Sequence, residues 1–127
     1  MLTYAATTDA VRVTVRPVWI EGQSDALARR YAFAYFVEVA NESDDAVQLL
    51  RRHWTIRHGD GRTEEVEGEG VVGVQPIIGP GEVHRYHSFC LLSTPTGTME
   101  GTYLMERATG ERLRVAIPRF DLVGGLN

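Results

Sequence analysis

The sequence predicts an all-β protein, a two-sheet β-sandwich of immunoglobulin or fibronectin type III topology, with a barrel as the alternative. Three observations predict this fold class. Segments of alternating apolar and polar residues recur along the chain, turn residues separate them about every 8 to 12 residues, and no segment has convincing helical periodicity. A chain of 127 residues suits one hydrophobic core, so we expect a single domain over residues 1–127.

The first half of the chain contains two clear strands. Residues 11–17 alternate strictly and place three valines on one face. Pro17 cannot donate a backbone hydrogen bond, so this strand should lie at an edge or contain a bulge where it continues to Ile20. Residues 21–30 are polar and predict a surface loop. The next strand is the most aromatic one, and its inward face should carry Tyr31, Phe33, Tyr35, Val37 and Val39.

A third strand spans residues 47–57. Its alternation places Leu50 and Trp54 on one face with Arg52, and Leu49 on the other. An arginine on an apolar face requires either a bulge that re-aims it or a carboxylate partner. Gly59-Asp60-Gly61 predicts a tight hairpin that leads into a short strand at residues 62–67.

Alternation resumes after the glycine-rich middle of the chain. It predicts strands at residues 83–92, 98–105 and 113–117. We expect Pro118 to end the last strand and residues 120–122 to dock as a tail.

The middle segment, residues 68–81, holds five glycines and two prolines, and Gly68, Gly70 and Gly73 match the pattern G-x-G-x-x-G. In a dinucleotide-binding fold a helix follows these glycines and its N-terminus faces a pyrophosphate. Pro76 and Pro80 come too soon for such a helix, so we exclude a Rossmann site. We expect the glycines to serve positive-φ turns or close packing, although successive backbone amides could still cradle a phosphate.

Arginines near this segment are the other candidate site residues. Arg51, Arg52 and Arg57 flank Trp54, and arginine binds phosphate in a bidentate manner. The same side chains could instead cover a sheet edge or pair with glutamates across the hairpin. Our candidate pyrophosphate site is therefore Gly68, Gly70 and Gly73 together with Arg52 or Arg57.

Composition narrows the class of function. The net charge is −4 and all 13 basic residues are arginine, so no global field attracts nucleic acid. Cys90 is the single cysteine, which fits a small buried residue in a reducing compartment. Neither a secretory leader nor a run of about 18 apolar residues is present. We therefore expect a cytoplasmic protein without membrane insertion.

The sequence gives little support for catalysis or metal binding. His84 and His87 are three residues apart, so in a strand they point to opposite faces and cannot chelate one ion. The glutamates at 64, 65, 67 and 69 could offer oxygens to Mg²⁺ but are more typical of a solvated face. Ser88 and Cys90 lie near histidines without an elbow motif or orienting acid. We expect no cofactor, no metal site and no enzyme activity.

Ordered motifs over nearly the whole chain resemble the ApaG family. They are Arg52-His53-Trp54-x-Ile56, Gly68-x-Gly70-Val71-Val72-Gly73-x-Gln75-Pro76-x-Ile78-x-Pro80-Gly81, Tyr86-x-Ser88, Leu92-Ser93-Thr94-Pro95-x-Gly97-x-Met99-x-Gly101-x-Tyr103-x-Met105 and Ile117-Pro118-x-Phe120-x-Leu122. One departure is Phe89, where the family usually has glycine, and it adds an aromatic side chain to the surface.

The resemblance implies a fibronectin type III-like sandwich in a bacterial cytoplasmic protein associated with cobalt resistance and magnesium efflux. It implies no catalytic residues, and it only suggests a pyrophosphate role for the three glycines. Our leading hypothesis is a binding module that recognises an unknown protein partner or small ligand through residues 68–81 and an exposed sheet face. The alternatives are a nucleotide or pyrophosphate binder linked to diadenosine polyphosphate metabolism and, third, a direct metal sensor. Pairing of exposed edge strands would give a homodimer.

Overall fold

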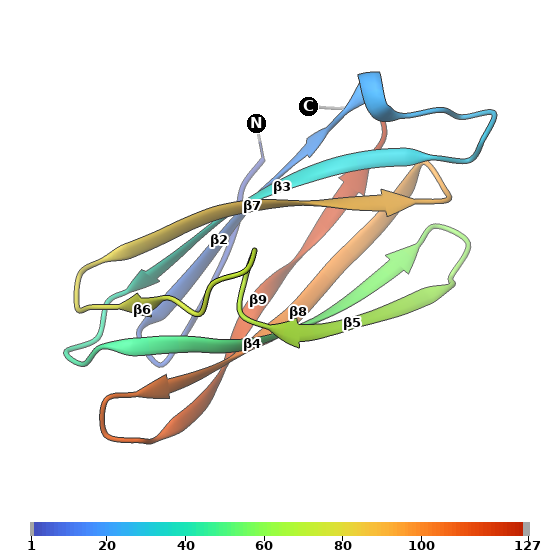
Figure 1. Cartoon of the computed structure of the whole chain (residues 1–127). Helices are drawn as coiled ribbons and strands as arrows, with labels where there is room; N and C mark the ends of the chain where they lie inside the picture. The colour runs from blue at the N-terminus through green and yellow to red at the C-terminus, as the bar shows by residue number, and fades with distance from the viewer. Residues whose placement is uncertain (1, 126–127) are drawn as a thin grey trace.

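The computed structural model describes residues 2–125, and their backbone forms two antiparallel sheets (Figure 1). One sheet has the order β1-β2-β3-β7, with β1 at Tyr4–Thr8, β2 at Val11–Trp19, β3 at Tyr31–Asn41 and β7 at Val83–Leu92. The other has the order β5-β4-β8-β9, with β4 at Val47–His58, β5 at Thr63–Glu69, β8 at Thr96–Arg107 and β9 at Arg112–Val123. A two-residue strand, β6 (Ile77–Ile78), also pairs with β4, and η1 (Glu21–Gln23) is a single 3-10 turn.

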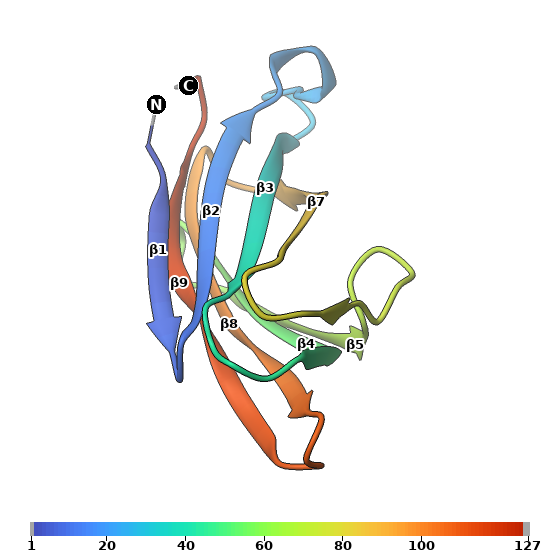
Figure 2. The same cartoon turned by 90° about the vertical axis from the view of Figure 1, so that its left-hand side faces the viewer.

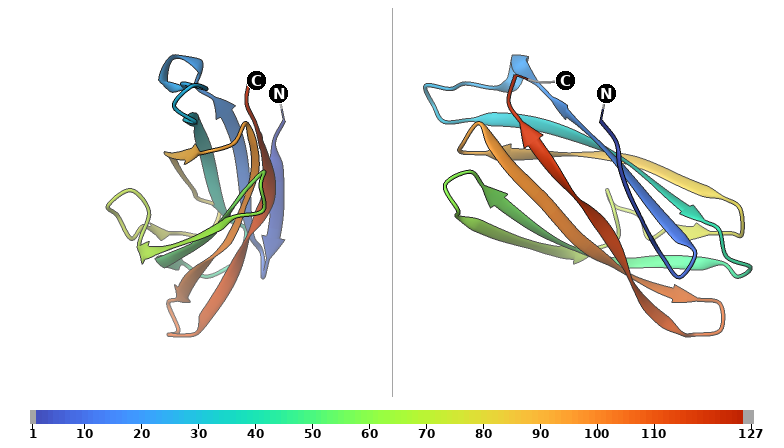
Figure 3. Two further views of the ribbon diagram at one scale, coloured as in Figure 1. Left: turned by 90° about the vertical axis from the view of Figure 1, so that its right-hand side faces the viewer. Right: turned by 180° about the vertical axis from the view of Figure 1, so that it is seen from behind.

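The two sheets face each other as a β-sandwich, which confirms the predicted fold class. They are closed along one side, where β1 and β2 both contact β9. Figure 2 and the right-hand view of Figure 3 show β1 beside β9 on that side. On the opposite side the edge strands β5 and β7 diverge, and the glycine-rich segment projects there (Figure 2). The sandwich therefore has one closed side and one open mouth.

The core follows from the alternation in each strand. Apolar residues of one parity point inward, as a half-buried strand requires. The largest fully buried side chains include Phe33, Leu49, Leu92, Tyr103 and Phe120. The inward face predicted for β3 is confirmed, since Phe33, Tyr35, Val37 and Val39 are all buried in the shared cluster and Tyr31 packs against it.

One alternation was predicted wrongly. In β4 the fully buried residue is Leu49, whereas Leu50 is only half-buried. The pairing of β4 with β8 shifts between Leu49 and Arg51, so Leu50 is the extra residue of a β-bulge. The bulge switches the inward parity from odd to even positions, which brings Trp54 and Arg52 onto the inner face.

Both prolines lie where the strand tolerates a missing amide, but the prediction that Pro118 ends its strand was wrong. Pro17 pairs with Tyr35 of β3 at a point where β1, whose last partner is Val15, no longer covers β2. Pro118 does not end its strand. The pairing of β8 with β9 shifts at this position, and β9 continues through Phe120 to Val123. A bulge accommodates the missing amide, so the expected docking tail is part of the strand.

Two short elements were missed. Strand β1 joins β2 through Asp9 and Ala10, both with positive φ, and alanine is not a recognisable turn residue. Strand β6 lies inside the glycine-rich segment. No helix occurs between Gly73 and Gly125, as predicted from Pro76 and Pro80. Within residues 2–125, no helix has the length and apolar character needed to cross a membrane.

Candidate functional site

The glycine-rich segment forms a small hairpin at the open mouth. The amide of Val71 donates to the Val74 carbonyl at 2.8 Å and the amide of Val74 donates to the Val71 carbonyl at 3.1 Å. The two residues between them, Val72 and Gly73, have φ of 47° and 81°. Positive φ at both positions is the signature of a type I′ turn. Valine rarely adopts this conformation because of its branched Cβ, so Val72 is a strained position.

The valines of this hairpin differ in burial. Val71 is fully buried in the core cluster, while Val72 is 64% exposed at the tip. Val74 and Ile77 are also exposed, and Ile77 is 69% accessible. Val71 therefore anchors the turn, and the next residues present apolar side chains to solvent.

The three glycines of the G-x-G-x-x-G pattern each meet a local backbone demand. Gly70 has φ of +63° and a Cβ there would overlap the Val74 carbonyl. Gly73 needs its positive φ for the turn. A Cβ on Gly68 would lie 2.8 Å from Nη1 of Arg52. The glycines thus allow the hairpin to fold back tightly over an arginine.

Arg52 holds the base of this hairpin. The Leu50 bulge turns the side chain of Arg52 inward, and its Nη1 donates to the carbonyls of Glu69 and Gly70, each at 3.1 Å. The Leu50 carbonyl in turn accepts from the Gly70 amide at 2.8 Å and from the side-chain amide of Gln75 at 2.9 Å. Neither reason expected for an arginine on this face is observed within residues 2–125: the bulge precedes Arg52 and leaves it on the face of Trp54, and its partners are backbone carbonyls instead of a carboxylate.

The structure brings together most of the candidate anion site. Arg52, Gly68, Gly70 and Gly73 all belong to the hairpin and its support. Arg57 lies elsewhere, opposite Thr63 at the far end of the β4–β5 pair and on the outer face of the sheet. Of the two arginines in the predicted site, Arg52 therefore lies beside the glycines and Arg57 does not.

A cavity of about 310 Å³ lies beneath the hairpin, between the sheets. It is lined by both sheets and the turn: Tyr35, Arg52, Trp54, Glu69, Val71, Val72, Gly73, Tyr86 and Ser88. Tyr86 and Tyr103 share a hydrogen bond between their hydroxyls, and Tyr35 packs edge-on against Trp54 with ring centroids 5.2 Å apart. Part of the wall thus consists of aromatic rings with hydroxyl groups.

The cavity places buried phenol groups beside one guanidinium charge. Burial raises the pKa of Tyr35, Tyr86 and Tyr103, and the nearby Arg52 charge only partly opposes this effect. The phenols therefore stay protonated and can donate hydrogen bonds. Among residues 2–125, no carboxylate lies within 4.0 Å of the half-buried Arg52 guanidinium, which contacts neutral carbonyls instead.

The histidines are dispersed. His53 pairs with Glu65, and His87 packs on Phe36 with ring centroids 5.3 Å apart. Burial lowers the pKa of His84, whose Nε2 is a buried atom without a hydrogen-bond partner. No cluster of three or more metal-ligating side chains occurs in the part of the chain that the structure describes.

Sequence reasoning missed a polar cluster around the buried His58. Its Nε2 lies 2.6 Å from the Glu64 carboxylate, while Nδ1 lies 3.1 Å from both the amide nitrogen and the hydroxyl of Ser93. Because the Ser93 amide donates to Nδ1, this nitrogen is the acceptor and Nε2 carries the proton. The acceptor lone pair is therefore engaged by the backbone, and Arg62 donates to the Ser93 hydroxyl at 2.5 Å. The cluster ties the turn after β7 to β4 and β5 rather than activating a nucleophile.

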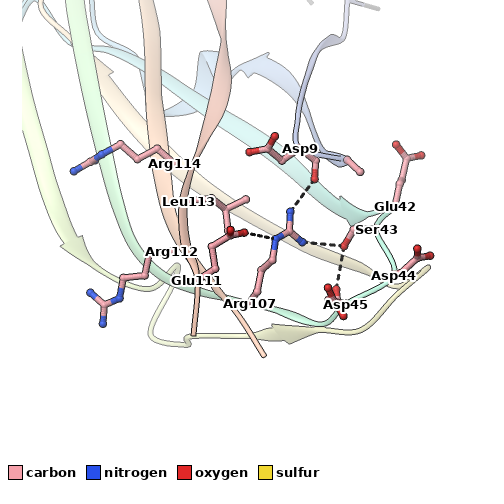
Figure 4. Close-up of a pocket in the computed structure, with 11 residues that line it drawn as sticks. Asp9, Glu42, Ser43, Asp44, Asp45, Arg107, Glu111, Arg112, Leu113 and Arg114 are labelled. Atoms are coloured by element: carbon pink, nitrogen blue, oxygen red, sulfur yellow. Dashed lines mark hydrogen bonds and ion pairs between the residues drawn. The ribbon is translucent and has the colours of Figure 1, made fainter. Parts of the chain in front are cut away.

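A larger and more open hollow of about 820 Å³ lies near the β1–β2 and β8–β9 turns (Figure 4). Its centre is Arg107, which contacts the Glu111 carboxylate at 3.1 Å, the Ser43 hydroxyl at 3.3 Å and the Asp9 carbonyl at 3.2 Å. Figure 4 shows these three contacts converging on one guanidinium. Arg107 thus joins three turns, and each of its three side-chain nitrogens donates one of these hydrogen bonds.

Comparisons with known proteins agree with one another. A family model for the ApaG domain matches residues 21–107. A "Protein ApaG" from a Methylobacterium species is 52% identical over 119 residues, which span 94% of this chain and 92% of the relative. A "Protein ApaG" from Mesorhizobium japonicum is 48% identical over the same shares. The crystal structure of an ApaA protein from Bordetella pertussis superposes with a TM-score of 0.89 at 41% identity, covering 92% of this chain and 95% of that one.

Proposed function

The chain belongs to the ApaG family, and from this premise we propose that it is a non-catalytic binding module of the cytoplasm that contributes to divalent-cation homeostasis by engaging a protein partner. The hairpin at residues 70–74 and the segment that follows it to Gly81 form the recognition element. The observation that carries the proposal is the exposed apolar tip, Val72, Val74 and Ile77, on a firmly held base.

Apolar side chains that protrude together from a folded surface favour contact with a partner. Here the supporting backbone is bonded at several points. The Leu49 amide donates to the Pro76 carbonyl at 3.0 Å, and the Asn41 side-chain amide donates to the Ile78 carbonyl at 2.9 Å. A carboxylate oxygen of Glu82 accepts from the Gly79 amide at 2.6 Å. A recognition loop held in this way loses little conformational entropy on binding.

The experiment uses bacteria that lack their own ApaG protein. The wild-type gene should restore growth in cobalt and normal cellular magnesium, and the double variant Val72→Asp with Ile77→Asp should not. The matched control is Val66→Asp on β5, which is exposed but lies outside the tip. Loss of the gene without any change in cobalt tolerance or magnesium content would refute the role in cation homeostasis.

The absence of catalysis is tested separately. Purified protein should leave ATP, diadenosine tetraphosphate and pyrophosphate unchanged with Mg²⁺ or Co²⁺ present. Turnover at a rate typical of enzymes, about 1 per second or more, would overturn the proposal.

A second function is favoured by one specific observation, the half-buried Arg52 beside hydroxyl groups and without a carboxylate within 4.0 Å in residues 2–125. A guanidinium in this position can bind a small anion such as a phosphate group, against the charge of Glu69, which also lines the cavity. Titration with pyrophosphate and ATP should then shift the backbone amide signals of Gly68 to Gly73. Saturating ligand without such shifts would exclude this second function.

A further inference from the structure

Strand β7 has an unguarded edge. It ends the order β1-β2-β3-β7 and pairs with β3 without interruption, from Val83 opposite Ala40 to Leu92 opposite Tyr31. Its other edge therefore presents unpaired backbone groups over ten residues that include no proline. A long regular edge of this kind is a template for pairing with another strand.

The other outer strands are protected. Strand β5, on the other side of the mouth, carries four glutamates in seven residues, and such charge discourages edge pairing. Strands β1 and β9 contact each other at the closed side of the sandwich. Within the described residues, β7 is therefore the long edge strand that lacks these forms of protection.

The outward face of β7 carries exposed apolar side chains as well as Arg85 and His87. Phe89 and Leu91 are 61% and 60% exposed, and Val83 is partly exposed. The rings of Phe36, His87 and Phe89 form a continuous row, with centroids 5.3 Å and 5.8 Å apart. Strand β7 thus combines an exposed row of aromatic rings with an unpaired backbone edge, and both features are typical of interaction surfaces.

We propose that a second copy of this chain covers this surface, with β7 pairing antiparallel to β7 around a two-fold axis at His87. The pairing would join two four-stranded sheets into one of eight strands. A two-fold contact uses the same patch on both copies and covers both edges at once. The edge of β7 borders the same open mouth as the recognition loop, but the proposed pairing uses no residue of that loop and stands independently of the proposed function.

The side chains of β7 favour this register. With His87 on the axis, Val83 lies opposite Leu91 of the partner subunit, and Arg85 lies opposite Phe89 of the partner subunit. The chain already stacks an arginine on a phenylalanine nearby, since the Arg16 guanidinium lies 4.4 Å from the centre of the Phe36 ring. Glu38 lies 3.6 Å from Arg85 and balances its charge. An axis at Arg85 would instead place two guanidinium groups face to face, which is unfavourable.

The strand overlap also favours His87. This residue lies at the middle of Val83–Leu92, so the two copies of β7 overlap almost completely. An interface based on one strand edge is small, and small interfaces are weak. We therefore expect a monomer–dimer equilibrium that becomes visible at high protein concentration.

Sedimentation velocity of the purified full chain tests the proposal. Wild-type protein should shift from monomer to dimer between about 10 μM and about 1 mM. Phe89→Arg should remain monomeric over this range because it faces Arg85 of the partner subunit. Leu27→Arg, at an exposed apolar residue in the loop between β2 and β3, is the control and should dimerise like the wild type. Urea unfolding verifies that each variant is folded.

A charge pair tests the register. The double variant Phe89→Arg with Arg85→Glu should recover the dimer because opposite charges then meet across the axis. A protein that stays monomeric at about 1 mM would overturn the proposal. A dimer that survives Phe89→Arg would overturn it as well, and so would a double variant that fails to recover.

Discussion

Replacing Val72 by asparagine should stabilise the protein. An L-residue in the left-handed region costs about 1 to 2 kcal/mol, and a branched Cβ lies at the upper end of this range. Val72 has φ of 47°. Asparagine tolerates this conformation, and an Asn-Gly pair is the preferred sequence of a type I′ turn. We take the relief of strain as about 1.5 kcal/mol.

The loss of apolar burial works in the opposite direction. Val72 is 64% exposed, so only about a third of its side-chain surface is covered. A fully buried valine contributes about 1.5 kcal/mol, so the loss is about 0.5 kcal/mol. The net gain in the free energy of unfolding is then about 1 kcal/mol, or about 3 °C in Tm for a chain of this length.

Urea unfolding monitored by tryptophan fluorescence measures this gain, because Trp54 is buried and becomes exposed on unfolding. The control is Val74→Asn, at the other exposed valine of the hairpin, which has no positive φ to relieve. It should be neutral or slightly destabilising. If Val72→Asn were no more stable than the wild type, the inference of strain at this turn would be wrong.

Three further predictions address other parts of the molecule. Arg52→Met should lower the free energy of unfolding by about 2 kcal/mol and accelerate hydrogen exchange at the Val71 and Val74 amides, because the Glu69 and Gly70 carbonyls lose their donor. The control Arg57→Met should change the free energy of unfolding by less than about 0.5 kcal/mol. Gly101→Ala should lower the free energy of unfolding by about 3 kcal/mol or prevent folding, because the new Cβ would overlap the His53 carbonyl. The control Gly22→Ala has open space around the new Cβ and should leave the thermal melt unchanged. Burial raises the pKa of the Cys90 thiol from 9.0 to about 12, so the unfolded chain releases the thiol proton first as pH rises. The free energy of unfolding should therefore fall between about pH 9 and 12. Cys90→Ala should make this fall less steep, and an unchanged pH dependence would contradict the role of Cys90.

The sequence was sufficient for the fold class because alternation and turn residues act locally. The strand at Val83–Leu92 was predicted with its observed bounds, and prolines near the glycines correctly excluded a helix. The bulge at Leu50 could not be located in the same way. It depends on the partner strand β8, and alternation along β4 alone gives no sign of the position at which the parity changes.

The candidate site was only partly accessible from sequence for a similar reason. The glycines and Arg52 share a site because β5 returns beside β4, with Arg52 opposite Gly68. Arg57 also belongs to β4, but its position along the strand and its face separate it from them. The contact between His58 and Ser93 joins residues 35 positions apart, and no local pattern in the sequence links the two.

The Leu50 bulge makes this region sensitive to chain length. Removing that one residue would restore an unbroken ladder between β4 and β8, and every side chain on one side of the change would then face the opposite way. Leu49 would turn toward water, or Arg52 would turn away from the hairpin that it supports. We therefore expect a systematic survey of single-residue deletions to find this stretch of β4 intolerant, even where replacing the Leu50 side chain has little effect.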